Sequence, residues 1–185
     1  LIWGLFSTEQ GRVLCNGVPI DQDLPAWFQR IGYVPQDVFI ADSTVLEAVA
    51  FGLEPHEIDE ARVRECLAVA ELTEVVDSLE NGLMTMIGHN AVRLSGGQRQ
   101  MVMFASVLIK KPKILLLDEP VSALDMHHQC VLLDCVRKFT REHGITTVMI
   151  LHDLSLASQF SDEVLLLSDG KIKAKGEAKK TITKE

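Results

Sequence analysis

The sequence predicts an α/β domain built on a mostly parallel sheet with flanking helices, and three observations support this fold class. Residues 114–117 form a short apolar run, typical of a strand buried on both faces. A helix-like stretch at 126–142 leads to a second apolar strand at 146–151, and a strand–helix–strand unit of this length implies a parallel pair. Residues 37–93 are predicted to be mostly helical.

Composition limits the class of protein. The chain has 185 residues, of which 47% are hydrophobic, and this suits one globular domain with a sizeable core. The net charge of −8 argues against a nucleic-acid-binding face, and no apolar run approaches the ~20 residues needed to span a bilayer. The cysteines at 15, 66, 130 and 135 have no metal-ligand spacing, so we expect reduced thiols in a cytosolic protein.

Upstream of the buried strand, the pattern predicts the end of a helix at 1–6 and a short strand at 11–15. It then predicts a short helix at 24–30 and another strand at 31–34. Asn16-Gly17 is a strong turn pair, and Pro25 suits the first turn of its helix. Further helices are expected at 59–71 and 73–79. An earlier helix should begin with the capping box of Thr44 and Glu47, with Ser43 as an alternative cap.

In the C-terminal part, the pattern predicts a helix at 154–160 and a strand at 163–168. A tight Asp169-Gly170 turn should then lead to a last strand at 171–175. Six lysines and two glutamates follow from residue 171 onward. We expect this basic end to finish as a frayed, solvated tail.

Two adjacent acids, Asp118 and Glu119, follow the buried strand, and Pro120 then blocks further ladder pairing. Burying two neighbouring carboxylates costs several kcal/mol unless they share a cation or a proton. A strand-end acid pair is therefore a natural Mg²⁺ site, because Mg²⁺ takes oxygen ligands and substrate phosphates. On this stretch alone, an ordinary acidic turn is an equal alternative.

His152 follows the second strand of the same strand–helix–strand unit. Ligands of such sheets bind beyond the carboxyl ends of the strands, so we expect Asp118, Glu119 and His152 to share one edge. His127 and His128 begin the intervening helix without a partner set for a metal, and we expect both to be exposed.

Ser95 and Gln98 form the S-x-x-Q pattern of a capping box at the start of a long helix, residues 97–110. Gly96 and Gly97 lie between them, and glycines allow a backbone to approach a ligand closely. A helix N-terminus also favours anions. Both interpretations, a cap and a ligand surface, can hold together.

Five motifs in order are Y-V-P-Q at 33–36, L-S-G-G-Q at 94–98, I-L-L-L-D-E-P at 114–120, S-A-L-D at 122–125, and His152. Together they cover nearly the whole chain and resemble the ATP-binding-cassette (ABC) transporter ATPase family. The resemblance implies a P-loop NTPase-like core with an α-helical subdomain. It divides the chain into four parts. Residues 1–36 are a remnant of the ATPase core with the Q-loop, and residues 37–93 are the helical subdomain. Residues 94–176 hold the signature helix, Walker B, the D-loop and the H-switch, and residues 177–185 are a tail.

In that family a P-loop, G-x-x-x-x-G-K-[ST], and the strands around it precede the helix that residues 1–6 resemble. The 185 residues contain no such motif. We therefore expect little or no ATP hydrolysis by this chain alone.

The resemblance also implies roles for single residues with ATP and Mg²⁺. Asp118 would bind Mg²⁺, mostly through water, and Glu119 would be the general base. Gln36 would reach Mg²⁺ and the attacking water, and His152 would contact the γ-phosphate. The implied nucleotide-binding residues facing the opposite subunit are Ser95, Gly96, Gly97, Gln98 and Asp125.

The implied partners are a second cassette, in a head-to-tail homodimer or heterodimer, and transmembrane domains, with no nucleic acid. The implied location is cytoplasmic, peripheral on the inner face of the membrane. The first half resembles exporter-type and the second half importer-type cassettes, which leaves an unusual natural member or a recombined chain open. The alternatives are a non-catalytic truncated or engineered cassette fragment, and a non-transport ABC ATPase.

Overall fold

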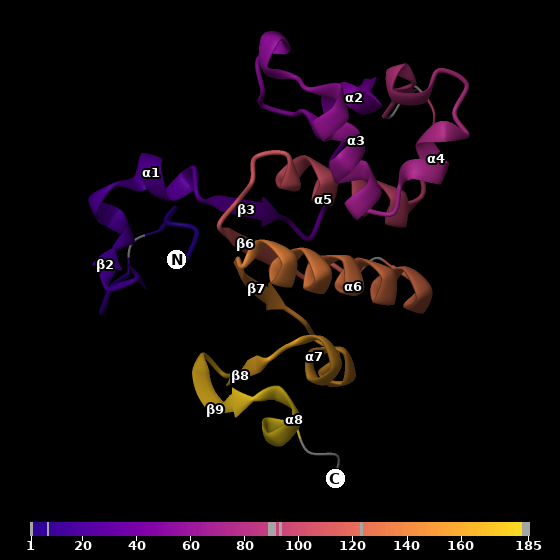
Figure 1. The fold of residues 1–185 in the computed structure, drawn as a ribbon. Coiled ribbons are helices and arrows are strands. Elements are labelled where there is room, and N and C mark those ends of the chain that lie inside the picture. Colours follow the sequence, from indigo (N-terminus) through magenta and orange to yellow (C-terminus); the bar gives the residue numbers. More distant parts are fainter. Residues whose placement is uncertain (1, 7, 89–91, 93, 123, 183–185) are drawn as a thin grey trace.

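The computed structural model describes residues 2–6, 8–88, 92, 94–122 and 124–182 (Figure 1). The strands are β1 (Leu14–Cys15), β2 (Val18–Pro19), β3 (Ile31–Val34), β4 (Ser43–Thr44), β5 (Met86–Ile87), β6 (Ile114–Asp118), β7 (Thr146–Ile150), β8 (Glu163–Ser168) and β9 (Lys171–Glu177). The α-helices are α1 (Leu24–Phe28), α2 (Val45–Val49), α3 (Glu60–Val69), α4 (Thr73–Asp77), α5 (Gly96–Leu108), α6 (Met126–His143), α7 (Leu154–Phe160) and α8 (Ala178–Thr181). Short 3-10 helices are η1 (Ile20–Gln22), η2 (Pro55–Glu57) and η3 (Gly82–Met84).

A parallel sheet in the order β3-β6-β7 forms the centre of the α/β fold. Val34 pairs with Leu117, and Leu117 in turn pairs with Met149, so the three strands end at the same edge. The middle strand β6 is buried along Leu115 to Leu117, as its apolar run predicts. The predicted strand–helix–strand unit is confirmed, because β6 and β7 are parallel and α6 connects them.

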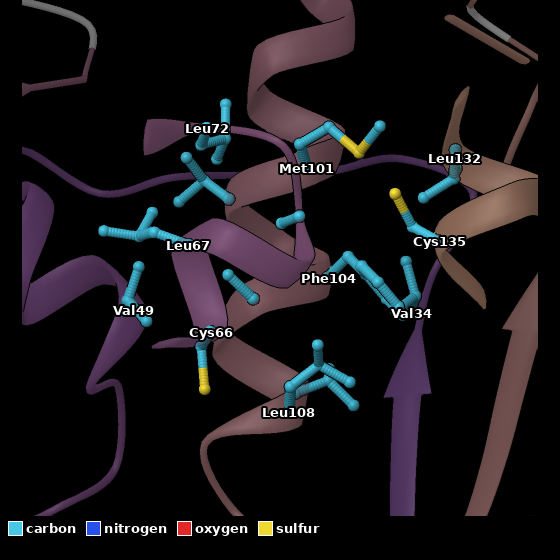
Figure 2. Close-up of a cluster of buried hydrophobic side chains, with 14 of the residues drawn as sticks. Val34, Val49, Cys66, Leu67, Leu72, Met101, Phe104, Leu108, Leu132 and Cys135 are labelled. Atoms are coloured by element: carbon cyan, nitrogen blue, oxygen red, sulfur yellow. The ribbon is translucent and has the colours of Figure 1, made fainter. Parts of the chain in front are cut away.

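Helix α5 joins the helical region to the sheet. Figure 2 shows it between Val49 and Leu67 of α2 and α3 on one side and Val34 of β3 on the other. Phe104 of α5 is fully buried in the single apolar cluster that these elements share.

Burial also raises the pKa of the Cys135 thiol of α6 to about 11. Among the described residues, no helix is both long and apolar enough to cross a membrane.

The helical region follows the sequence in most respects. Helix α2 begins with the predicted capping box, in which the Thr44 hydroxyl accepts from the Glu47 amide and the Glu47 carboxylate accepts from the Thr44 amide. The alternative cap, Ser43, instead donates to the carbonyl of Ala41. The expectation of a mostly helical segment missed the antiparallel pair β4–β5. Two-residue strands like these carry too little periodicity to be detected in a sequence.

Two expectations about the ends of the chain were wrong. Residues 2–6 form turns and bends rather than a helix end, with Gly4 in a left-handed conformation at φ 86°. The Trp27 indole donates to the carbonyl of Ile2 and ties this segment to α1. At the other end the expected frayed tail begins as α8, whose first residue, Ala178, is buried. Residues 183–185 lie outside the described part of the chain.

The two predicted turn pairs are confirmed. Asn16 and Gly17, between β1 and β2, both have positive φ angles, as do Asp169 and Gly170 between β8 and β9. Asparagine, aspartate and glycine tolerate this conformation best, which is why these pairs identify tight hairpins.

Candidate functional site

The carboxyl edge of the parallel sheet brings four polar side chains together. Asp118 is the last residue of β6, and Glu119 follows it at once. Gln36 lies two residues beyond the end of β3, and His152 lies two residues beyond the end of β7. Since the three strands are parallel and in register, their following loops leave the sheet side by side.

Glu119 is the centre of this group. The Gln36 Nε2 donates to Glu119 Oε2 at 2.8 Å, and His152 Nε2 lies 2.6 Å from Glu119 Oε1. Both carboxylate oxygens therefore have a partner, each from a different loop. The predicted grouping of Asp118, Glu119 and His152 at one sheet edge is found, and Gln36 joins it by binding Glu119 directly.

The backbone of Glu119 is in the left-handed region, with φ 45°. A non-glycine residue in this region is uncommon and costs roughly 1–3 kcal/mol, and such residues cluster at functional sites. The turn directs the carboxylate towards Gln36 and His152, and it is followed by a backbone bond from the Ser122 amide to the Glu119 carbonyl. Sequence reasoning did not anticipate this conformation.

Asp118 has a neighbour that sequence reasoning missed. The Tyr33 hydroxyl donates to Asp118 Oδ2 at 3.4 Å, and the Tyr33 ring stacks on Trp3 with centroids 4.3 Å apart. Burial, followed by the charge of Asp118 and this bond, raises the pKa of Tyr33. The tyrosine therefore stays neutral and remains a donor at neutral pH. Only the adjacency of β3 and β6 identifies it, because Tyr33 is far from Asp118 in sequence.

The donor set at this edge suits Mg²⁺ better than a transition metal. Asp118 supplies carboxylate oxygens, and the Gln36 amide still carries an oxygen besides the nitrogen that binds Glu119. In the described part of the chain, no group of three or more His, Cys, Asp or Glu side chains could enclose a metal. Magnesium ions usually keep several waters and bind one or two carboxylates plus substrate phosphates, so an open site of this kind fits them.

A second cluster lies at the start of α5. Ser95 is the N-cap, with its hydroxyl accepting from the Gln98 amide, while Gln98 Oε1 accepts from the Ser95 amide at 2.9 Å. The capping box predicted there is confirmed. Gly96 and Gly97 form the first turn of the helix, so their amides lie at its positive end.

Asp125 caps the start of α6 and binds His128. Its Oδ1 accepts from the His128 amide at 3.0 Å, and its Oδ2 lies 2.7 Å from His128 Nδ1. The backbone bond, followed by the imidazole, lowers the pKa of Asp125. His127 is exposed as expected, and the expectation for His128 holds in part, because its side chain is 42% exposed while its ring packs against Gly97. Ala123, within the S-A-L-D motif, lies outside the described residues.

The two clusters are separate within one chain. Between Gln36, Asp118, Glu119 and His152 on one side and the residues around Ser95 and Asp125 on the other, the described residues show no hydrogen bond or ion pair. A cavity of about 380 Å³ opens beside the second cluster, with Gly97, Gln98 and His128 in its lining. The first cluster is not part of that lining.

This fold and its sheet-edge carboxylates define an α/β nucleotide-binding class, and comparisons with known proteins identify the family. The family model described as ABC transporter matches residues 1–122, more than half of the chain. The chain therefore belongs to the ABC transporter family.

Three relatives illustrate the similarity. An uncharacterized ABC transporter ATP-binding protein of Bacillus subtilis, YfiB, is 38% identical over 95% of this chain and 30% of its own length. An ATP-dependent lipid A-core flippase of Cupriavidus metallidurans is 39% identical, again over 95% of this chain and 30% of its own length. A solved bacterial Atm1-family ABC exporter with ATP bound has a TM-score of 0.85 and 29% identity, covering 97% of this chain and 31% of that chain. The chain thus spans about a third of the length of these relatives.

Proposed function

We propose that this chain is the ATP-binding and ATP-hydrolysing part of an ABC transporter of exporter type. The placement of Glu119 between Gln36 and His152 at the carboxyl end of β6 carries the proposal. The flippase and exporter relatives match both halves of this chain, and this favours the exporter type.

Glu119 is the proposed general base for the attacking water. Its carboxylate is held from two sides, so the lone pairs have a defined direction before any ligand binds. A positioned base of this kind contributes about 10²–10⁴-fold to a rate. The His152 side chain is 76% exposed, so the imidazole is accessible to the γ-phosphate of a bound nucleotide while it contacts Glu119.

Asp118 and the amide oxygen of Gln36 are the proposed ligands of Mg²⁺. When bound, the ion would offset negative charge on the phosphates. Tyr33 supports this role, because its hydroxyl donates to Asp118 Oδ2 and helps to orient the carboxylate. Phosphoryl transfer depends mainly on such positioning and on charge stabilisation.

The second cluster is the proposed contact with nucleotide held by another cassette, in a head-to-tail dimer. Ser95 to Gln98 present a helix N-terminus, which favours phosphate, and Asp125 lies beside them through His128. The separation of the two clusters within one chain supports this arrangement, because a second chain would supply the opposing half.

A transmembrane domain is the second proposed partner, which would place the chain on the cytoplasmic face of a membrane. Phe39, Phe51 and Met84 are large apolar side chains in or beside the helical region, each more than 60% exposed. Large apolar side chains that remain exposed are candidates for contact with such a partner.

The test measures Mg·ATP binding by calorimetry and Mg·ATP turnover, for the chain alone and for the chain joined behind the P-loop segment of a related cassette. We expect little or no turnover by the chain alone, because none of its residues forms the phosphate-gripping motif. In the joined protein, Glu119→Gln should lower turnover about 10²–10⁴-fold while nucleotide binding persists.

Glu163→Gln, in the exposed first residue of β8, is the matched control and should leave turnover unchanged. Joined protein that folds but binds no nucleotide would support the alternative of a non-catalytic cassette. Unchanged turnover in Glu119→Gln would remove Glu119 as the base. Robust turnover by the chain alone would contradict its expected inactivity.

A further inference from the structure

The imidazole of His128 lies between the starts of two helices. On the α6 side it is held by Asp125, which accepts from the His128 amide and lies 2.7 Å from Nδ1. The ring cannot turn about its side-chain bonds without losing the contact with Asp125 Oδ2. The same carboxylate thus caps α6 and fixes the orientation of the ring.

On the α5 side, the ring meets Gly97. A Cβ atom added at Gly97 would lie 3.0 Å from His128 Cδ2 and 3.2 Å from Cγ, which is tighter than ordinary contact. Gly97 sits inside α5, where its φ is not positive, so the backbone itself does not require glycine. In a helix alanine is favoured over glycine by about 1 kcal/mol. The ring of His128 therefore supplies a reason for glycine at this position.

A cavity adjoins the ring of His128. The cavity of about 380 Å³ is lined by Gly97 and His128 themselves, together with residues of the α3–α4 connection such as Glu71 and Leu72. A larger residue at 97 would push the ring towards this space. Such a movement would cost the 2.7 Å contact between Nδ1 and Asp125 Oδ2.

We propose that His128 is a positioning residue that sets the spacing between the start of α5 and the start of α6. Asp125 holds its ring in one orientation, and the ring packs against Gly97. This spacing matters for function only if the proposed function holds, because both helix starts then face nucleotide bound by a second cassette. The contact itself exists without nucleotide, and it can be tested without it.

The first arm of the test is a double-mutant cycle on the 185-residue chain, in which the Tm is measured for wild type, Gly97→Ala, His128→Ala and the double variant. Overpacking against the locked ring should lower the Tm of Gly97→Ala by roughly 2–4 °C. In the His128→Ala background, the same Gly97→Ala change should leave the Tm unchanged or raise it, because alanine then favours the helix. An equal effect of Gly97→Ala in both backgrounds would overturn the proposal.

If Gly97→Ala fails to fold with His128 present, the double variant decides the matter. A folded double variant supports the steric lock, and an unfolded one contradicts it.

The second arm measures amide chemical shifts by NMR. His128→Ala should move the amides of Gly96, Gly97 and Gln98 on the neighbouring helix, because the ring that seats them is lost. His127→Ala is the matched control, since the exposed His127 contacts the ring of His128 but is not the group that meets Gly97. Equal shifts in both variants, or none in His128→Ala, would contradict the proposal.

The third arm separates the hydrogen bond from the ring by titrating the Asp125 carboxyl in each variant. His128→Ala should raise the pKa of Asp125 towards its ordinary value, because the side-chain bond is lost. His128→Asn should restore the low pKa through its amide donor while still relieving the clash in Gly97→Ala. An Asp125 pKa that is the same in all three proteins would show that the ring is not locked. Failure of ATP turnover would leave all three arms unaffected, so the two proposals fail separately.

Discussion

The imidazole Nε2 of His152 lies 2.6 Å from Oε1 of Glu119, and the amide of Gln36 holds the other carboxylate oxygen at 2.8 Å. Three loops, which follow three different strands, thus meet on one side chain. The register of the parallel sheet brings these loops together, because Val34, Leu117 and Met149 occupy paired positions near the ends of β3, β6 and β7. The chemistry proposed for this chain depends on that alignment.

Gln36 should matter for turnover but little for stability. In the joined protein, Gln36→Ala should lower Mg·ATP turnover on the order of 10–100-fold, because Glu119 loses the bond that orients it and the metal loses an oxygen ligand. Steady-state turnover together with a Tm measurement separates the two effects. Gln22→Ala, an exposed glutamine in η1, is the control. Turnover that is unchanged in Gln36→Ala would remove this residue from the site.

Thr44 rather than Ser43 should cap α2. Thr44→Ala removes the hydroxyl that accepts from the Glu47 amide, and it should lower the free energy of unfolding by about 0.5–2 kcal/mol. Ser43→Ala breaks only a bond to the nearby Ala41 carbonyl, and its effect should stay within about 0.5 kcal/mol. Urea denaturation measures both. A larger loss from Ser43→Ala would show that the cap is misassigned.

The same capping box should make stability depend on pH. The backbone and hydroxyl bonds from Thr44 lower the pKa of Glu47 in the folded chain. A carboxyl whose pKa is lower when folded stabilises the protein above its unfolded pKa of about 4.3, and this contribution disappears as the pH falls through the folded pKa.

Wild type should therefore be more stable than Glu47→Gln near pH 7, and this difference should shrink on acidification below about pH 4.3. Urea denaturation of both proteins from pH 7 to pH 3 measures this difference. A constant or growing difference would contradict the assignment. Glu74→Gln, in the first turn of α4 without a cap bond, is a control for general charge effects.

Phe104 should contribute most to the junction between the helical region and the sheet. Its side chain is fully buried and packs edge-on against Phe139 of α6, with ring centroids 6.5 Å apart. Phe104→Ala should lower the free energy of unfolding by about 3–5 kcal/mol. Phe39→Ala, at a side chain that is 80% exposed, should change it by less than about 0.5 kcal/mol. Similar losses in the two variants would contradict the core in Figure 2.

The sequence was sufficient where a local pattern determines the structure. The apolar run of β6, the turn pair Asp169-Gly170 and the S-x-x-Q cap at Ser95 were all found in place. The sheet edge was also predictable, since parallel strands present their carboxyl ends together and Glu119 and His152 each follow one.

The rest depended on contacts between distant segments or on short elements. Tyr33 was missed as a partner of Asp118, because only the pairing of β3 with β6 brings them together. The pairing of β4 with β5 was missed because each strand has two residues. His128 was within reach of the sequence, since the i, i+3 spacing from Asp125 is that of an N-cap and the third residue of its helix.

The most direct test of the central claim is a measurement of whether the side chains of Glu119 and His152 touch. Ring ¹⁵N and ¹H resonances of His152 are recorded by NMR in wild type, in Glu119→Gln, and in the control Glu163→Gln. Glu119→Gln should shift the Nε2 resonance of His152, and Glu163→Gln should leave it in place. If the His152 ring resonances are the same in all three proteins, the two groups are not in contact, and the proposed catalytic edge is wrong.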